Sequence, residues 1–250
     1  MGTFSRRAVY LDLDGTLLGP DGDLLAGEDR GFSGAGVEAL RLLRMEGIPY
    51  AFVSGRSQTR VEEAARMLGA DSALGEIGAL DAGYPTKPGQ TVHDAIRETG
   101  IPAELLAREP ELLDHPVSAL GREGSHVLRG VVGADAGDWV TERSDGSLRL
   151  ADNGRIGPGE VRVFHLVPTA SSKALSVERD IARRGIDPEE CLSVGDSRED
   201  MAIGDVVGTV ALVANGATAE PRLVDMASFV TDASHGAGVL EAIRRWGGFR

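Results

Sequence analysis

Two aspartates, Asp12 and Asp14, follow a short apolar run and stand immediately before Gly15. The run Ala8–Leu11 is typical of a buried strand, and a glycine directly after the acids ends that strand. The turn then brings a carboxylate, a backbone carbonyl and a nearby hydroxyl into a small volume. This grouping suits phosphoryl chemistry, in which one carboxylate attacks phosphorus, a hard cation neutralises charge and a second carboxylate moves protons. The alternative for this stretch alone is a strand that ends in an ordinary Asp-Gly turn.

A second apolar strand is expected over Tyr50–Val53, and it ends in Ser54, Gly55 and Arg56. A hydroxyl at the carboxyl end of a strand can donate to a phosphate oxygen, and Ser57 can cap the helix that follows. Strands that end in Ser-Gly turns are common, so this signal gains weight only beside the others.

Two later segments carry further charged groups at the starts of expected helices. Lys173 stands in the first turn of one helix, where its ammonium can pair with a nucleophile and a phosphate; a solvated lysine is the alternative. The apolar run 191–194 leads into Asp196, and Asp200 lies on the first turn of the next helix. Paired acids there favour a cation site, although aspartate is also an ordinary helix cap.

Taken together and in this order, the four motifs resemble the haloacid dehalogenase superfamily of phosphohydrolases. The motifs are DLDGT from Asp12, SGR from Ser54, the lone Lys173, and GDSRED from Gly195. They are spread over most of the chain and leave only its middle unmatched. The resemblance implies that Asp12 is the nucleophile, which forms an aspartyl phosphate, and that Asp14 is the general acid and base.

The resemblance also implies a Mg²⁺ cofactor and a phosphate site. The metal would be held by Asp12, by Asp14 through its carbonyl and by Asp196, while Asp200 would support the metal through water or hold Lys173. The expected phosphate-binding residues are Ser54, Gly55, Arg56, Lys173 and Asn215. Such groups would stabilise the charge that redistributes over the phosphoryl oxygens in the transition state.

Both flanks of the chain alternate between short apolar strands and amphipathic helices. The expected helices cover residues 33–46, 57–68 and 171–184, and the expected strands cover 8–11, 50–53, 192–195, 208–213 and 228–230, with a strand-and-turn segment at 74–80. This alternation predicts a parallel sheet with helices on both faces. Ligands of such sheets bind at the carboxyl ends of the strands, where Asp12, Ser54 and Asp196 fall.

The middle of the chain has a different pattern. Two expected helices, 91–98 and 103–113, are followed by expected strands at 126–132, 147–150 and 161–167. Helices followed by strands with Asp-Gly and Asn-Gly turns between them favour an α+β module with an antiparallel sheet.

The predicted fold class is therefore α/β, a Rossmann-like doubly wound parallel sheet core with an inserted α+β cap domain. We place the core at residues 1–82 and 167–250 and the cap at 83–166. In the family, an insertion at this place is a C2 cap, and its helix and strand content resembles the B subtype.

Composition narrows the choice of partners. The 250 residues carry a formal net charge of −13, which argues against nucleic acid or an anionic membrane. Hydrophobic content of 42% predicts a globular chain. The single cysteine, Cys191, excludes an intrachain disulfide, and we find no signal-peptide core and no apolar run that spans a bilayer. We expect a cytoplasmic monomer or homodimer.

The C-terminal stretch, 214–218 and 229–239, resembles archaeal-type phosphoglycolate phosphatases and their sucrose-phosphatase-like relatives. The expected substrate is thus a small phosphorylated metabolite, either phosphoglycolate or a sugar phosphate. Among the cap residues, Arg129, Arg162 or His165 are candidates to contact the leaving group, while most cap arginines are expected to be solvated.

Other activities remain open at this stage. The segments 54–56 and 75–79 also resemble trehalose-6-phosphate phosphatases, and mannosyl-3-phosphoglycerate phosphatases are a further possibility. Phosphomannomutases share the cap type and the DxDGT motif, so a phosphotransferase is a third. A phosphometabolite-binding module without catalysis is the alternative from another class.

Overall fold

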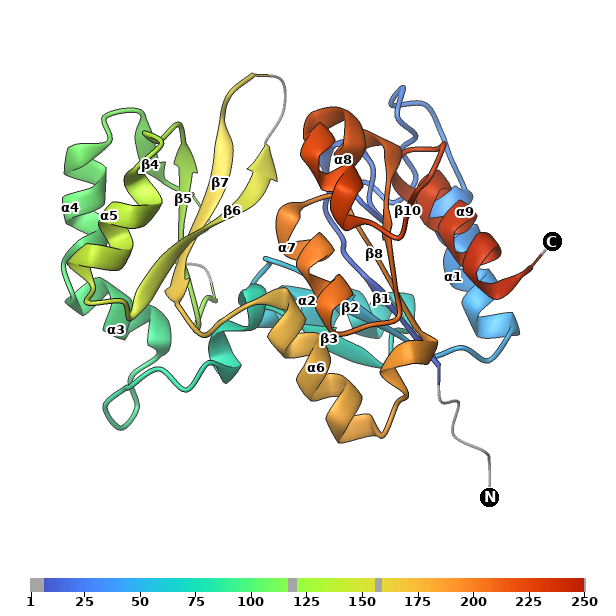
Figure 1. Ribbon diagram of the computed structural model, residues 1–250, viewed down its shortest axis with the longest axis horizontal. Helices are drawn as coiled ribbons and strands as arrows, with labels where there is room; N and C mark the ends of the chain where they lie inside the picture. Colours follow the sequence, from blue (N-terminus) through green and yellow to red (C-terminus); the bar gives the residue numbers. More distant parts are fainter. Residues whose placement is uncertain (1–6, 117–120, 156–158, 250) are drawn as a thin grey trace. The chain divides into compact units, whose positions relative to one another are not determined.

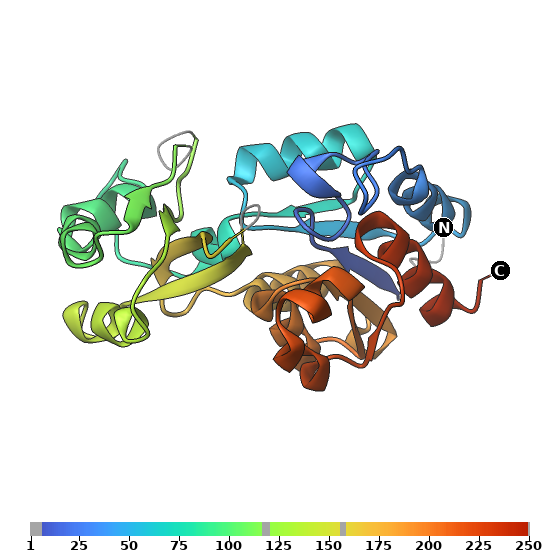
Figure 2. The ribbon, with the colours of Figure 1, turned by 90° about the horizontal axis from the view of Figure 1, so that it is seen from above.

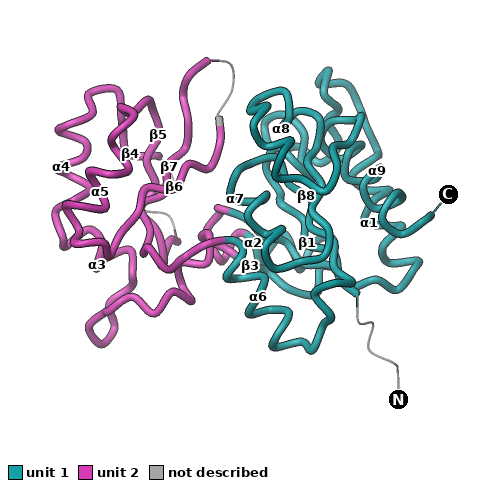
Figure 3. Tube along the Cα trace, in the orientation of Figure 1, with its two compact units in different colours: residues 1–54, 61–74, 173–250 teal, residues 55–60, 75–172 magenta. Residues whose placement is uncertain are grey.

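The computed structural model describes residues 7–116, 121–155 and 159–249 (Figure 1). The chain divides into two compact units (Figure 3). Unit 1 comprises residues 1–54, 61–74 and 173–250, and unit 2 comprises residues 55–60 and 75–172. Unit 1 contains a parallel sheet and unit 2 an antiparallel sheet, so the predicted fold class is confirmed.

The sheet of unit 1 has the strand order β10-β9-β8-β1-β2-β3. Its strands are β1 (Ala8–Leu11), β2 (Tyr50–Val53), β3 (Ser72–Leu74), β8 (Cys191–Gly195), β9 (Thr209–Leu212) and β10 (Phe229–Val230). Strand β1 pairs in parallel with β2 on one side and with β8 on the other. The strand order therefore reverses at β1, and in open α/β sheets the carboxyl ends at such a reversal are where ligands bind.

Helices cover both faces of this sheet (Figure 2). They are α1 (Ala35–Met45), α2 (Gln58–Leu68), α6 (Lys173–Arg184), α7 (Arg198–Met201), α8 (Ala214–Ala219) and α9 (His235–Gly247), with 3-10 turns η1 (Pro20–Gly22), η3 (Pro188–Glu190), η4 (Ala202–Asp205) and η5 (Pro221–Met226). Alternate side chains of β1 enter different cores: Val9 and Leu11 pack with α1 and α9, and Tyr10 packs with α6. Burial on both faces explains why β1 is apolar throughout.

A buried carboxylate ties α6 to the sheet. Asp180 is 2% exposed and accepts hydrogen bonds from the hydroxyls of Tyr10 on β1 (3.0 Å) and Ser72 on β3 (2.8 Å). Arg183 and Arg184 pair with the same carboxylate at 2.6 and 3.0 Å. Burial alone would raise the pKa of Asp180, but these donors outweigh it and hold the pKa below its ordinary value. The contact fixes the strand that leads into the Asp-Leu-Asp motif.

The sheet of unit 2 is antiparallel, with the order β4-β5-β7-β6. Its elements are η2 (Glu76–Asp81), α3 (Val92–Glu98), α4 (Ile101–Arg108), β4 (Leu112–Asp114), β5 (His126–Gly130), α5 (Ala136–Arg143), β6 (Leu148–Arg155) and β7 (Arg162–Pro168). Side chains of the three helices, such as Ile96, Leu105 and Val140, share one core with Leu128 and Phe164 of the sheet. None of the helices in the described ranges combines the length and hydropathy needed to cross a bilayer.

The structure differs from the expected elements at three places. The helix expected over 103–113 is wrong at its end, because α4 stops at Arg108 and residues 112–114 pair with β5. Helix α5 was not expected, because its local sequence pattern is weak. Burial of Val140 against the sheet stabilises it instead. The strand-and-turn segment at 74–80 is a strand only to Leu74, after which η2 begins.

Substitution of Asp180 by Asn tests the attachment of α6 to the sheet. The amide keeps the volume but loses the charge that the tyrosine, serine and arginine donors bind. We expect urea unfolding at pH 7 to show a loss of about 1.5–3 kcal/mol.

The pH dependence of this loss has a definite sign. Because the folded pKa of Asp180 is lowered, its contribution is full above the unfolded pKa of about 4 and disappears as pH falls through the folded value. The difference between Asp180→Asn and the parent should therefore shrink in acid. Asp225→Asn, at an exposed position, is the control and should leave the unfolding midpoint unchanged. Equal midpoints for the two variants at pH 7 would contradict the assignment.

Candidate active site

The first acidic motif lies at the carboxyl end of β1. The backbone N–H of Asp12 donates to the carbonyl of Val194 on β8 (3.1 Å), so the residue continues the sheet pairing by one step. Gly15 has a φ of +82°, and a Cβ there would lie 2.3 Å from a carboxylate oxygen of Asp196. Only glycine fits this close approach. The hydroxyl of Thr16 donates to the same carboxylate at 3.4 Å.

Three carboxylates converge at this edge of the sheet. Oxygens of Asp12, Asp196 and Asp200 all lie within 4.8 Å of one another. Asp12 is 5% exposed and Asp200 is 1% exposed, so at least two of these acids are removed from bulk water. Buried charges of one sign are costly unless they are paired or hold a metal.

Lys173, one of the chain's two lysines, supplies part of the compensating charge. Its ammonium is 2.8 Å from Asp12 Oδ1 and 2.7 Å from Asp200 Oδ1, and its side chain is 2% exposed. Burial would lower the pKa of Lys173, but the two carboxylates outweigh it and raise that pKa. The solvated alternative considered for Lys173 is therefore wrong.

The acids remain in excess of this one cation. Burial is the largest influence on Asp12, whose pKa is raised to about 7 although Lys173 opposes the rise. Burial, followed by repulsion from Asp12 and Asp200, raises the pKa of Asp196 well above its ordinary value. Three carboxylates face one ammonium, and their oxygens are the ligand atoms that a hard divalent cation prefers. The cluster therefore fits such a cation.

Asp200 is fixed from both of its oxygens. Its Oδ2 accepts hydrogen bonds from the backbone N–H and the hydroxyl of Ser197, at 3.0 and 2.5 Å, in a capping box at the start of α7. Its Oδ1 holds Lys173, which is one of the two roles expected for Asp200. A Cβ on Gly195 would lie 2.1 Å from the Asp200 Cβ, which explains the glycine at the end of β8.

The remaining predicted residues of unit 1 have different environments. Asp14 is exposed, in contrast to Asp12. Ser54 is 2% exposed and its N–H donates to Leu74 (2.9 Å), which holds the end of β2 beside β3. The side-chain amide of Asn215 donates to the Gly15 carbonyl at 2.8 Å. Asn215 therefore contacts the turn of the first motif.

Sequence reasoning missed His235, which contacts the same turn. Its backbone N–H donates to Asn215 Oδ1 (3.0 Å), and its Nδ1 lies 3.1 Å from the Gly15 carbonyl. The only local signal was its place at the first position of α9, because the contact spans 220 residues. Gly55 and Arg56, also predicted to bind phosphate, belong to unit 2.

Comparison with known proteins gives the family and the relatives that this chain resembles. A family model described as haloacid dehalogenase-like hydrolase matches residues 150–243. A phosphoglycolate phosphatase from Methanothermobacter thermautotrophicus is 28% identical over 246 residues, which cover 97% of this chain and 100% of that protein.

Two solved structures share the fold. The structure of Thermoplasma acidophilum 0175 has a TM-score of 0.70 at 20% identity and covers 96% of this chain and 98% of its own. The sucrose-phosphatase from Synechocystis sp. PCC6803, solved with sucrose and phosphate, has a TM-score of 0.66 at 18% identity and covers 98% and 99%. The chain is thus similar to haloacid dehalogenase-like hydrolases, and the resemblance inferred from its four motifs is confirmed. Its similarity to a phosphatase along nearly the whole chain supports phosphatase activity.

Substitution of Lys173 by Met tests the charge balance of the acidic cluster. Without added divalent cation, the substitution leaves the buried Asp12 and Asp200 and the half-buried Asp196 beside no ammonium. We expect a loss of about 3–5 kcal/mol in the free energy of unfolding at pH 8. The loss should be smaller at pH 5, because a carboxyl with a pKa near 7, as in Asp12, is then protonated and needs no counter-charge.

Lys87→Met provides a matched control, since that lysine is 74% exposed. It should change stability by no more than about 0.5 kcal/mol at either pH. Chemical unfolding followed by circular dichroism measures both variants. A Lys173→Met protein as stable as Lys87→Met at pH 8 would show that the buried pair is unimportant.

Proposed function

We propose that the protein is a Mg²⁺-dependent phosphomonoester hydrolase that acts on a small phosphorylated metabolite. The observation that carries this proposal is the buried Lys173 between Asp12 and Asp200, with Asp196 in the same cluster. The full-length similarity to a phosphoglycolate phosphatase supports the reaction class.

Asp12 is the proposed nucleophile, and its contact with Lys173 favours the ionised form that attack requires. One carboxylate oxygen of Asp12 forms a bond to phosphorus as the bond to the leaving alcohol breaks. Asp14 donates its proton to that alcohol. A water molecule then adds to phosphorus, Asp14 takes its proton, and phosphate leaves with Asp12 restored. The exposure of Asp14 lets it exchange protons with solvent.

The metal would be held by Asp12, Asp196 and the Asp14 carbonyl, and it would neutralise charge on the phosphoryl oxygens. Lys173 and the Ser54 hydroxyl are the proposed partners of those oxygens. Gly55, Arg56 and Asn215 complete the proposed phosphate site. The contact between Asn215 and the Gly15 carbonyl supports a role in shaping that site.

We assign catalysis and substrate specificity to the two domains predicted from the sequence. The core at 1–82 and 167–250 would carry out catalysis, and the cap at 83–166 would determine substrate specificity. The four catalytic aspartates and Lys173 all belong to unit 1, which supports the first part. Unit 2 spans residues 75–172, which begins eight residues before and ends six residues after the predicted cap, and it also includes residues 55–60.

The proposed substrate is phosphoglycolate or a sugar phosphate. The relative named phosphoglycolate phosphatase covers nearly the whole chain, and the sucrose-phosphatase shares the fold. Trehalose-6-phosphate or mannosyl-3-phosphoglycerate hydrolysis, hexose-phosphate isomerisation and binding without catalysis are the alternatives that the experiments below distinguish.

The metal requirement and the nucleophile are tested together with p-nitrophenyl phosphate. EDTA should remove turnover and added Mg²⁺ should restore it. Asp12→Asn should abolish turnover even with saturating Mg²⁺, because an amide cannot form the acyl phosphate. Asp225→Asn should keep the parent rate. Turnover that survives EDTA would exclude the proposed metal, and a fully active Asp12→Asn would exclude the nucleophile.

The role of Asp14 is tested by the choice of leaving group. With an alkyl phosphate, Asp14→Asn should lower kcat by roughly 10²–10⁴-fold, since the alcohol then leaves without a proton. The loss should be smaller with p-nitrophenyl phosphate, because p-nitrophenolate is stable as an anion. Equal losses on both substrates would argue against proton donation by Asp14.

A screen of phosphorylated metabolites that measures released phosphate tests the substrate class. We expect phosphoglycolate or a sugar phosphate to have a higher kcat/KM than p-nitrophenyl phosphate. Isomerisation of a hexose phosphate supported by glucose 1,6-bisphosphate would favour the mutase. Tight binding of the same compounds without phosphate release would favour a binding module.

A further inference from the structure

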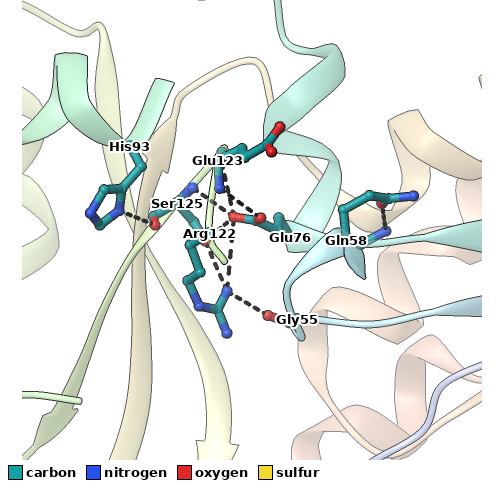
Figure 4. A network of polar contacts seen from close by, with 9 residues as sticks. Gly55, Gln58, Glu76, His93, Arg122, Glu123 and Ser125 are labelled. Atoms are coloured by element: carbon teal, nitrogen blue, oxygen red, sulfur yellow. Dashed lines mark hydrogen bonds and ion pairs between the residues drawn. The ribbon is translucent and has the colours of Figure 1, made fainter. Parts of the chain in front are cut away.

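A buried glutamate anchors one loop of unit 2. Glu76, at the start of η2, is fully buried and has a φ of +52°. Its carboxylate accepts hydrogen bonds from three consecutive backbone N–H groups, those of Glu123 (3.0 Å), Gly124 (3.0 Å) and Ser125 (2.9 Å), and from the Ser125 hydroxyl (2.9 Å) (Figure 4). So many donors on one carboxylate fix the loop that carries Arg122.

The side chain of Arg122 extends from this loop and is 6% exposed. Its Nη1 donates to the Gly55 carbonyl at 2.9 Å and to the Ser125 hydroxyl at 3.0 Å (Figure 4). The nearest oxygen of Glu76 is 4.0 Å away, and the buried Nε has no hydrogen-bond partner. A buried guanidinium with an unsatisfied donor is costly, so stability alone does not explain it. Arg122 is thus an exception to the expectation that most cap arginines are solvated.

The carbonyl that Arg122 binds belongs to the turn after Ser54. The same turn is held from its other side, because the N–H of Glu76 donates to the Arg56 carbonyl at 2.9 Å. The Gln58 side chain accepts from the Gly75 N–H at 2.9 Å. Residues 55–58 are therefore joined to residues 75–76 and, through Arg122, to the loop at 122–125.

Glycine has the widest backbone freedom of any residue, and Gly55 directly follows the proposed phosphate ligand Ser54. Without an external contact, the peptide plane after Gly55 can rotate and change the direction of the N–H and hydroxyl groups beside it. We propose that Arg122 is a positioning residue for phosphate binding, which holds the Gly55 carbonyl and so keeps the Ser54–Gly55 turn in one conformation. The inference rests on the proposed phosphatase function, because that function gives Ser54 its role.

Arg122→Met removes the donor at similar length. With p-nitrophenyl phosphate we expect kcat/KM to fall about 10–100-fold, the effect of one charge-assisted hydrogen bond. The affinity for inorganic phosphate, measured as an inhibition constant, should weaken in parallel. The affinity for Mg²⁺ should stay the same, since the acidic cluster lies on other strands.

Arg122→Lys should recover part of the loss. A single nitrogen, Nη1, makes both contacts, so one ammonium can in part replace it. Arg143→Met is the matched control in the same unit. That arginine is 49% exposed and pairs with Glu104 at 2.6 Å, and its variant should retain the parent kinetics and phosphate affinity.

Several outcomes would overturn the inference. The first is an Arg122→Met enzyme whose affinity for phosphate equals that of the parent. The second is an equal loss of affinity for phosphate and for Mg²⁺, which would indicate general disruption of the fold. If Arg122→Met does not fold, Arg122→Gln takes its place, and unchanged phosphate affinity there would also refute the role. A parent protein that hydrolyses no p-nitrophenyl phosphate would instead refute the proposed function.

Discussion

The buried ammonium of Lys173 is the interaction on which the arrangement of the site depends. It joins Asp12 and Asp200, which lie 161 and 27 residues away in the sequence. Charges removed from water are tolerated only with close partners, so β1, α6 and α7 must bring these groups together. The acids still outnumber the ammonium, and burial, with a smaller contribution from the neighbouring Asp200, raises the pKa of Asp12. The excess of carboxylates fits a further cation.

The sheet explains how three distant segments reach one place. Strand β1 is central, pairs with β2 and β8, and buries both of its faces. Its position is further fixed from α6 through the Tyr10–Asp180 contact. Because parallel strands present their carboxyl ends at one edge, acids placed directly after β1 and β8 become neighbours. The geometry of the acidic cluster is thus a consequence of strand order and of the contacts that anchor β1.

The turns at Gly15 and at Gly55 are both held by side chains from distant segments. The Gly15 carbonyl is held by Asn215 and His235, and the Gly55 carbonyl is held by Arg122. Glycine permits the tight approach that each turn needs, but it also leaves the backbone free to move. Side chains from distant segments supply the restraint that glycine lacks. The glycine turns therefore depend on contacts with distant side chains for a defined conformation.

The sequence by itself determined the features that depend on neighbouring residues. The observed bounds of β1 and β2 match the apolar runs, and the acids of the first and last motifs follow their strands as expected. Tertiary structure decided what depends on distant partners: the β4 strand, which exists by pairing with β5, the α5 helix, and the burial of Arg122. A local pattern records propensity and amphipathicity, whereas the contacts of Arg122 and His235 arise only when segments 67 and 220 residues apart are packed together.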